Sequence, residues 1–101
     1  MNPMQQMLQQ AQRMQRELEK AHTELEAKEF VGEKNGMVTV TMTGDKKVKE
    51  IKIEPEALEP DNAEILQDAI MVAINDTMGK IIAEEEALSE KVTGRKGGFP
   101  F

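Results

Sequence analysis

The apolar residues between positions 4 and 25 recur every seven residues, which is typical of a helix with one narrow apolar seam. A second series of the same period begins three positions after the first, so the two occupy the a and d positions of about three heptads. Pro3 suits the first turn of such a helix, and Asn2 suits its N-cap. We expect this seam to pack against another helix, in this chain or in a second copy. The seam consists of Met4, Met7, Ala11, Met14, Leu18, Ala21 and Leu25.

After position 30 the pattern changes to one that favours strands. The Asn35-Gly36 pair predicts a hairpin turn, because both central residues of the favoured tight turn take positive φ. Residues 37–43 then alternate between apolar and polar, which predicts a half-buried strand. The residues on its apolar face are Val38, Val40 and Met42.

A third strand is predicted over residues 47–53, after a turn at Gly44. Ile51 and Ile53 share one face of this strand, while Val48 is out of phase with them. The mismatch indicates a β-bulge or a late start of the strand. We therefore expect three antiparallel strands in a meander.

Residues 65–82 are apolar at more than half of their positions, and they follow an Asp61 and Glu64 pair suited to a helix N-terminus. On a helical wheel these apolar residues cover more than half of the circumference. One three-stranded sheet cannot cover so wide a stripe, so we expect a second copy of the chain to cover the remainder. The residues expected at this homodimer interface are Ile65, Ile70, Ile74, Met78, Val38 and Val40.

Together these elements predict an α+β protein, in which two long helices flank an antiparallel three-stranded meander in the order α-β-β-β-α. Residues 1–93 are expected to form the single domain that a chain of 101 residues supports. Residues 83–91 are charged and are expected to project into solvent. Gly94 is a suitable helix stop, and residues 94–101 are expected to form a flexible basic tail that contains Phe99-Pro100-Phe101.

The chain has 13 Lys and Arg residues against 19 Asp and Glu residues, which gives a formal net charge of −6. This total argues against a nucleic-acid partner, but the charges are segregated along the chain. Acidic residues dominate positions 54–90, whereas basic residues collect in the first helix, in the third strand and after position 90. The lysines of the third strand are expected to protect a sheet edge from aggregation.

Two basic groups are candidates for contacts with DNA phosphates, although the sequence leaves a merely solvated surface equally open. One lies in the first helix and the other at the C-terminal end of the chain. Arginine and lysine suit phosphate oxygens and carry no base readout. The candidate residues are Arg13, Arg16, Lys20, Lys91, Arg95 and Lys96.

The residues available for catalysis are sparse. The chain has no Cys, and His22 and Ser89 are its only His and Ser, placed on two predicted charged helices. We therefore expect no enzyme activity, no catalytic residues, no metal site and no cofactor. Three Phe residues are too few to form a base-stacking platform. No segment suits a signal peptide or a membrane span, so a cytoplasmic location is expected.

Residues 7–15 resemble the start of the YbaB/EbfC family of nucleoid-associated proteins, where Met-Lys-Gln-Ala-Gln precedes Met-Gln. Similarities to the family continue in order through nearly the whole chain, which ends in a stretch rich in Gly, Phe and Pro. One departure is Gln9, which stands where the family usually has a lysine. Further matching segments are Val38-Thr39-Val40 before Gly44, Ile51-Lys52-Ile53-Glu54-Pro55, Leu66-Gln67-Asp68 and Ala73-Ile74-Asn75-Asp76.

The resemblance implies an α-β-β-β-α protomer in a tweezer-like homodimer that binds DNA without strong sequence preference. A role in nucleoid organisation or gene regulation in a bacterial cytoplasm is the corresponding expectation, with no enzyme activity. Because the dimer would be strongly acidic overall, its affinity for double-stranded DNA is expected to be weak to moderate. The alternative is a protein-binding scaffold or adaptor that acts through the helices or the C-terminal tail.

Overall fold

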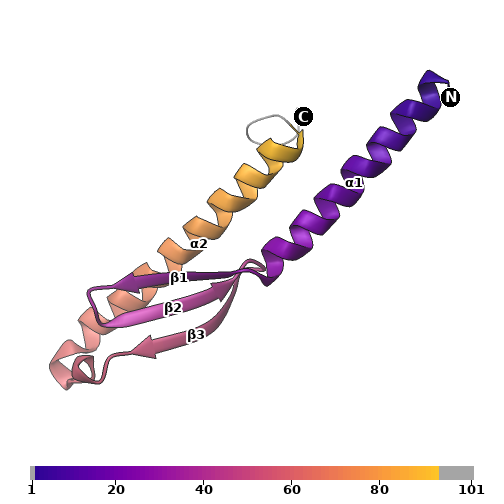
Figure 1. Ribbon diagram of the computed structural model, residues 1–101. Helices are drawn as coiled ribbons and strands as arrows, with labels where there is room; N and C mark the ends of the chain where they lie inside the picture. The colour runs from indigo at the N-terminus through magenta and orange to yellow at the C-terminus, as the bar shows by residue number, and fades with distance from the viewer. Residues whose placement is uncertain (1, 94–101) are drawn as a thin grey trace.

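The computed structural model describes residues 2–93. Both helices extend from the sheet toward the same end of the molecule, where the two termini of the described chain lie (Figure 1). This arrangement confirms the predicted α+β fold and its α-β-β-β-α order, while the domain boundary at residue 93 stays a prediction. The predicted tail, residues 94–101, lies outside the described residues. The elements are α1 (Pro3–Ala27), β1 (Glu29–Lys34), β2 (Val38–Thr43), β3 (Lys47–Ile53), the 3₁₀ turns Pro55–Ala57 and Pro60–Asn62, and α2 (Ala63–Thr93).

Local hydrogen bonds to the backbone determine where α1 begins and ends. The side chain of Asn2 accepts a hydrogen bond from the N–H of Gln5 at 2.8 Å, and Pro3 occupies the first turn, as the sequence predicts. At the other end Lys28 takes an extended conformation, and its N–H donates to the carbonyl of Leu25 at 3.1 Å. The chain then enters β1 directly, so the position of α1 depends on how this junction is held.

The three strands form an antiparallel sheet in the order β1-β2-β3, which confirms the predicted meander. The turn between β1 and β2 has Asn35 at φ 57° and Gly36 at φ 65°. Its closing hydrogen bond runs from the N–H of Met37 to the carbonyl of Lys34 at 3.0 Å. The Asn-Gly pair therefore acts as the sequence predicts.

A β-bulge interrupts the pairing of β2 with β3. Thr41 pairs with Glu50, but its neighbour Met42 pairs with Val48, so Lys49 is the extra residue. The bulge corrects the phase of Val48 and brings it to the same face as the isoleucines of β3. The predicted irregularity in the third strand is thereby confirmed.

α2 packs across β1 and β2 and forms the core with them. Its buried residues occur at every fourth position, and three of the four are small, so the helix lies close to the sheet. On the sheet side, the three inward residues of β2 are buried. The residues that meet in this layer are Ala69, Ala73, Thr77 and Ile81 of α2 and Val38, Val40 and Met42 of β2.

The burial of Val38 and Val40 corrects one sequence-based expectation. They are 1% and 0% exposed within a single chain, so they have no surface left for contact with a second copy. The alternating pattern correctly predicted that these side chains are buried. It could not distinguish between burial by the chain's own second helix and burial by a partner.

Gly32 of β1 sets the closeness of the helix to the sheet. A Cβ at this position would lie 2.2 Å from the hydroxyl oxygen of Thr77 and 3.0 Å from the carbonyl oxygen of Ala73. The Thr77 hydroxyl is itself buried and donates to that carbonyl at 2.7 Å. Glycine is therefore required here by contact with α2 rather than by backbone conformation.

The C-terminal end of α1 is fixed to the turn between β2 and β3. The N–H of Gly44 donates to the carbonyl of Lys28 at 2.9 Å. A Cβ on Gly44 would lie only 1.8 Å from the carbonyl oxygen of Leu25. α1 is thus anchored by direct backbone contact at one end, while the rest of the helix extends away from the sheet (Figure 1).

Two ion pairs add to this anchor and correct the expectation that residues 83–91 project into solvent. Lys28 pairs with Glu84 at 2.5 Å, and Lys46 pairs with Glu85 at 3.1 Å. Both glutamates are half-buried in the groove between α2 and the α1 junction. The two ion pairs join α2 to residues about forty to fifty-six positions away, which the local charge pattern cannot reveal.

Candidate nucleic-acid interface

Three cations lie together along one side of α1. With about 100° of rotation per residue, Arg13, Arg16 and Lys20 fall within an arc of about 60°. All three side chains are exposed. We call these three residues the basic stripe. By the same geometry the stripe lies on the side of α1 opposite to the apolar seam, so it points away from α2.

The basic stripe is accessible and carries no internal partner. Within residues 2–93 the ion pairs all involve lysines near or in the sheet, and none involves Arg13, Arg16 or Lys20. Gln6 and Gln9 fall on the same side of the helix and are also exposed. The stripe therefore offers free guanidinium and ammonium donors, with neutral amides toward the N-terminus and carboxylates of α1 one turn toward the C-terminus.

The structure does not bring the second predicted basic group onto this stripe. Lys91 is exposed, but it lines the groove between α1 and α2 together with Ala21 and Glu24. On α1 that groove is bounded by Ala21 and Leu25 of the apolar seam, so Lys91 does not join the basic stripe. Arg95 and Lys96, the other predicted contacts in this group, lie outside the described residues.

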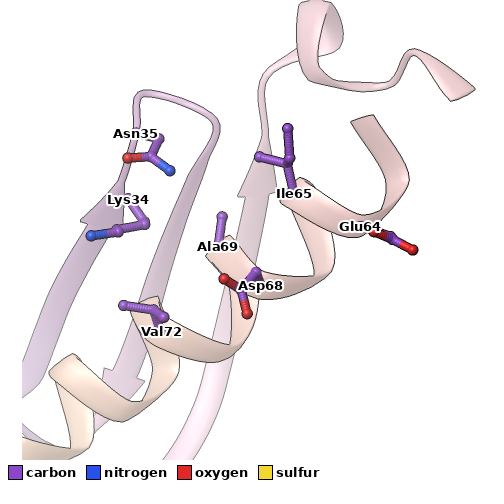
Figure 2. A pocket seen from close by; sticks show the side chains of 7 residues that line it. All are labelled: Lys34, Asn35, Glu64, Ile65, Asp68, Ala69 and Val72. Atoms are coloured by element: carbon purple, nitrogen blue, oxygen red, sulfur yellow. The ribbon is translucent and has the colours of Figure 1, made fainter. Parts of the chain in front are cut away.

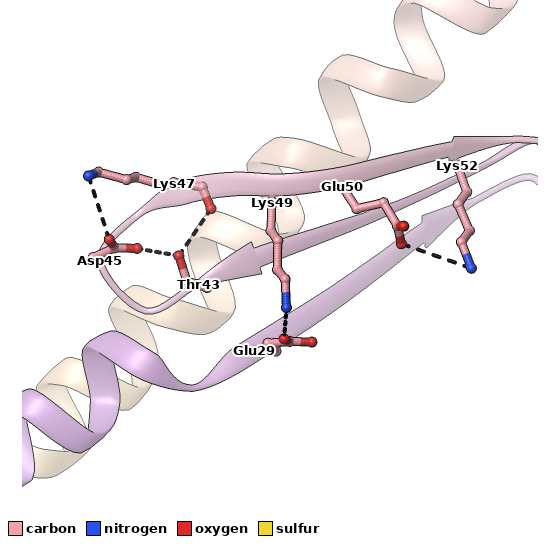
Figure 3. Close-up of polar contacts among 7 residues, drawn as sticks. All are labelled: Glu29, Thr43, Asp45, Lys47, Lys49, Glu50 and Lys52. Atoms are coloured by element: carbon pink, nitrogen blue, oxygen red, sulfur yellow. Dashed lines mark hydrogen bonds and ion pairs between the residues drawn. The ribbon is translucent and has the colours of Figure 1, made fainter.

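The lysines of β3 are engaged with acidic neighbours on the outer face of the sheet, as Figure 3 shows. Lys47 lies 3.9 Å from Asp45, and Lys52 lies 3.9 Å from Glu50. Lys49, at the bulge, forms a hydrogen-bonded ion pair with Glu29. That hydrogen bond, with the carboxylate's charge, raises the pKa of Lys49 above its usual value. This face is therefore nearly neutral and is a weaker candidate for phosphate contact than the basic stripe.

A second surface, which the sequence indicated only in part, lies where α2 meets the side of β3. Val48 and Ile51 pair with buried residues of β2, so they face the same side of the sheet as α2. They are nevertheless 43% and 41% exposed, because α2 covers β1 and β2 and does not extend over β3.

α2 adds its own apolar flank to this surface. The opposite flank faces β1, where the Lys80 ammonium donates to the carbonyl of Val31 at 2.6 Å. Helical geometry places a row of apolar residues of α2 on the side of β3, where half-buried Ile53 packs on the same core. We call the combined area the β3-side surface. Its residues are Val48 and Ile51 of β3 and Ile70, Met71, Ile74, Met78 and Ile82 of α2.

Ile65 does not belong to the β3-side surface. It is 53% exposed and lines a cavity of about 380 Å³ at the free edge of β1 (Figure 2). This cavity combines one lysine, two carboxylates and apolar side chains, without a nucleophile beside a base. The described part of the chain also contains no group of residues suited to hold a metal ion. The lining residues are Lys34, Asn35, Glu64, Ile65, Asp68, Ala69 and Val72.

Comparison with known proteins decides the family. The model of the YbaB/EbfC DNA-binding family matches residues 1–96. The chain belongs to this family. The resemblance noted in the sequence is thereby confirmed, and the family is a DNA-binding one.

Curated relatives of this chain support its assignment to the YbaB/EbfC family. A nucleoid-associated protein of Enterococcus faecalis is 42% identical over 100 residues, which cover 98% of this chain and 96% of the relative. A nucleoid-associated protein of Ruminiclostridium cellulolyticum is 44% identical over 97 residues, which cover 93% of this chain and 83% of the relative. The family assignment therefore rests on relatives that match over most of their length.

The fold also matches a solved structure. An uncharacterized protein from Helicobacter pylori superposes with a TM-score of 0.76 at 20% identity, covering 93% of this chain and 99% of that one. In the part of the chain that the structure describes, neither helix is both long and apolar enough to span a membrane. The structural match supports the fold described above.

Proposed function

We propose that the chain binds double-stranded DNA as a homodimer, with little dependence on sequence, through the basic stripe of α1. The observation that carries the proposal is the exposure of three unpaired cations on one side of a helix that extends from an otherwise acidic protein. The role would be nucleoid organisation or gene regulation in the cytoplasm. It is a binding role without catalysis.

The chemistry of the stripe suits phosphate better than bases. Arg13 and Arg16 offer planar forks that match phosphate oxygens, and Lys20 offers a point charge. Such contacts fix the position of a duplex and carry no sequence information themselves. Gln6 and Gln9 can add hydrogen bonds to phosphate or to base edges. Weak sequence preference follows from this composition.

The acidic remainder of the molecule sets the strength of binding. The chain carries a formal charge of −6, so a dimer repels DNA at long range and attracts it only where the stripe makes contact. Lys91, Arg95 and Lys96 would add charge from the end of α2. We expect measurable affinity at low salt and a rapid loss of affinity as salt rises.

The β3-side surface is the proposed site of homodimerisation. Two flanks of apolar side chains, one from the sheet and one from α2, are exposed together in a single chain, as is typical of interaction sites. A two-fold axis through this surface would bury the same residues of both copies. Of the residues expected at the interface, Ile70, Ile74 and Met78 belong to this surface. Ile65 lies apart from it, and Val38 and Val40 are already buried.

Dimerisation would also strengthen DNA binding. One basic stripe supplies three cations, whereas two stripes fixed in one dimer bind the same duplex with a high effective concentration for the second contact. A monomeric variant should therefore bind more weakly even with its stripe intact. Ile74→Glu tests this link, since it places a charge in the centre of the proposed interface without touching α1.

The direct test is a fluorescence-anisotropy titration of a short duplex at low salt. The stripe variant Arg13→Gln/Arg16→Gln/Lys20→Gln should bind at least about tenfold more weakly than wild type. The matched control Lys47→Gln/Lys49→Gln/Lys52→Gln changes the net charge equally and should retain most of the affinity. Equal losses in both variants would show that overall charge, and not the stripe, governs binding.

The adaptor alternative is favoured by one observation, the exposed apolar seam near the N-terminus of α1. It predicts protein partners that remain bound after nuclease treatment. The DNA-binding proposal predicts that co-purifying proteins are lost once nucleic acid is digested.

A further inference from the structure

The apolar seam of α1 is covered only in its C-terminal part. Met4, Met7 and Met14 are 79%, 69% and 49% exposed, whereas Leu25 on the same seam is buried. The difference arises because α2 lies against the C-terminal turns of α1 alone. A row of large exposed apolar side chains usually has an occupant. We call the uncovered part of the seam, together with the exposed Leu8 next to it, the upper seam; its residues are Met4, Met7, Leu8, Ala11 and Met14.

α2 is directed toward the upper seam. The two helices lie antiparallel in the groove where Lys91 lies beside Ala21 and Glu24. Figure 1 shows that α2 runs toward the N-terminal half of α1 and ends well before the N-terminus of that helix. The C-terminal end of α2 therefore lies beside the C-terminal half of α1, below the upper seam.

The chain that follows is long enough to reach every residue of the upper seam. Because Lys91 lies beside Ala21 and the helices are antiparallel, the end of α2 lies about 8 Å along α1 from Met14 and about 22 Å from Met4. Phe99 and Phe101 follow Thr93 by six and eight residues, so an extended chain carries them up to about 20 Å and 26 Å. The extended segment thus spans most of the upper seam, and it reaches Met4 only through Phe101.

The composition of this segment also matches. It contains Phe99 and Phe101, and aromatic rings make favourable contacts with the sulfur of methionine, the main residue type of the upper seam. Arg95 and Lys96 would pass close to Glu17, which follows Met14 by three residues and is therefore its neighbour on the surface of α1. The segment therefore offers apolar groups to the methionines and cations to the neighbouring carboxylate.

We propose that residues 94–101 dock along the upper seam of α1 in the same chain, with Phe99 and Phe101 packed on the exposed methionines. DNA is a poor occupant of this surface, because the basic stripe lies on the opposite side of the helix. The docked segment leaves the stripe free, and it brings Arg95 and Lys96 to α1. The proposal does not depend on DNA binding and is tested without DNA.

The first test is methyl NMR of the full chain labelled on its methionine methyl groups. In wild type, ring currents should shift the signals of Met4, Met7 and Met14 upfield. In the variant Phe99→Leu/Phe101→Leu, which keeps apolar side chains but removes the rings, these signals should move back. The signal of buried Met42 should stay in place and reports that the fold is intact. Unchanged signals from all three seam methionines would overturn the proposal.

The second test uses a spin label, since the chain has no cysteine of its own. With the label on Gly98→Cys, the methyl signals of Met7 and Met14 should broaden and that of Met42 should not. The control mixes two kinds of chain. One kind carries the spin label but no isotope label and is invisible to NMR, and the other carries the methionine methyl label but no spin label. Broadening that occurs only in the single-species sample supports docking within one chain. Broadening of the same size in the mixture would mean that a second copy supplies the segment, and would contradict the proposal.

Discussion

Methionine is used in opposite ways in two regions of this protein. Met42 of β2 is 1% exposed and completes the core beneath α2, while Met4 of α1 is 79% exposed and contacts none of the sheet. The sheet and the crossing part of α2 pack closely through glycine, alanine and threonine. The N-terminal half of α1 contributes nothing to that core. Its seam and its basic stripe are therefore available for intermolecular or terminal contacts, whereas the core residues are not.

A large loss of stability is expected when a single methyl group is added at Gly32, in the closely packed region. Gly32→Ala places a Cβ 2.2 Å from the Thr77 hydroxyl oxygen and should destabilise the fold by about 2–3 kcal/mol in chemical denaturation. Gly79→Ala is the matched control, because no atom lies within 4 Å of its added Cβ. The control should stabilise α2 by up to about 1 kcal/mol. Similar effects of the two changes would disprove the close contact.

Gly44→Ala tests the boundary between the two regions. Its Cβ would lie 1.8 Å from the carbonyl oxygen of Leu25, so the backbone at the end of α1 must move. We expect about 2 kcal/mol of destabilisation, with faster hydrogen exchange confined to the junction around Lys28. Exchange that rises equally in the centre of β2 would mean that α1 and the core unfold as one unit.

The ion pairs at the junction should have smaller effects. Lys28 and Glu84 are 2.5 Å apart, but their side chains are 53% and 40% exposed, so solvent screens the interaction. A double-mutant cycle with Lys28→Gln and Glu84→Gln should give a coupling of about 0.5 kcal/mol that diminishes in 1 M salt. A coupling that is several times larger and insensitive to salt would contradict this description.

The smallest effect expected is the pH dependence contributed by Lys49. Its pKa is raised by the hydrogen bond and charge of Glu29, so the protonated form is favoured in the folded state. The stabilisation is complete below the usual lysine pKa of 10.5 and is lost as pH rises through the higher folded value. Wild type should therefore lose slightly more stability than Lys49→Gln between pH 10 and 12. If the stability of the two proteins changes with pH in the same way, Lys49 does not contribute to this pH dependence.

Local patterns predicted much of this molecule. The Asn35-Gly36 turn, the alternation in β2 and the irregularity before Ile51 are determined by neighbours in sequence, and the structure confirms all three. The heptad spacing of α1 likewise predicted which residues share a seam. It could not predict that α2 covers only one end of that seam, because coverage depends on the length and direction of a distant helix.

The remaining differences have the same origin in contacts between distant residues. Val38 and Val40 were correctly predicted to be buried, but the apolar pattern does not identify which surface buries them. Glu84 and Glu85 looked solvated because their partners, Lys28 and Lys46, are far away in sequence. The sequence also could not show whether the two predicted basic groups lie together, because only the fold places Lys91 apart from the basic stripe on α1.

The central claim is that the basic stripe contacts DNA phosphates, and the salt dependence of binding tests it most directly. Each phosphate contact contributes about −0.9 to the slope of log affinity against log salt. We predict that the slope for Arg13→Gln/Arg16→Gln/Lys20→Gln is shallower than that of wild type by about 3 for each stripe engaged, while the β3 lysine control keeps the wild-type slope. A stripe variant that retains the wild-type slope would contradict the account.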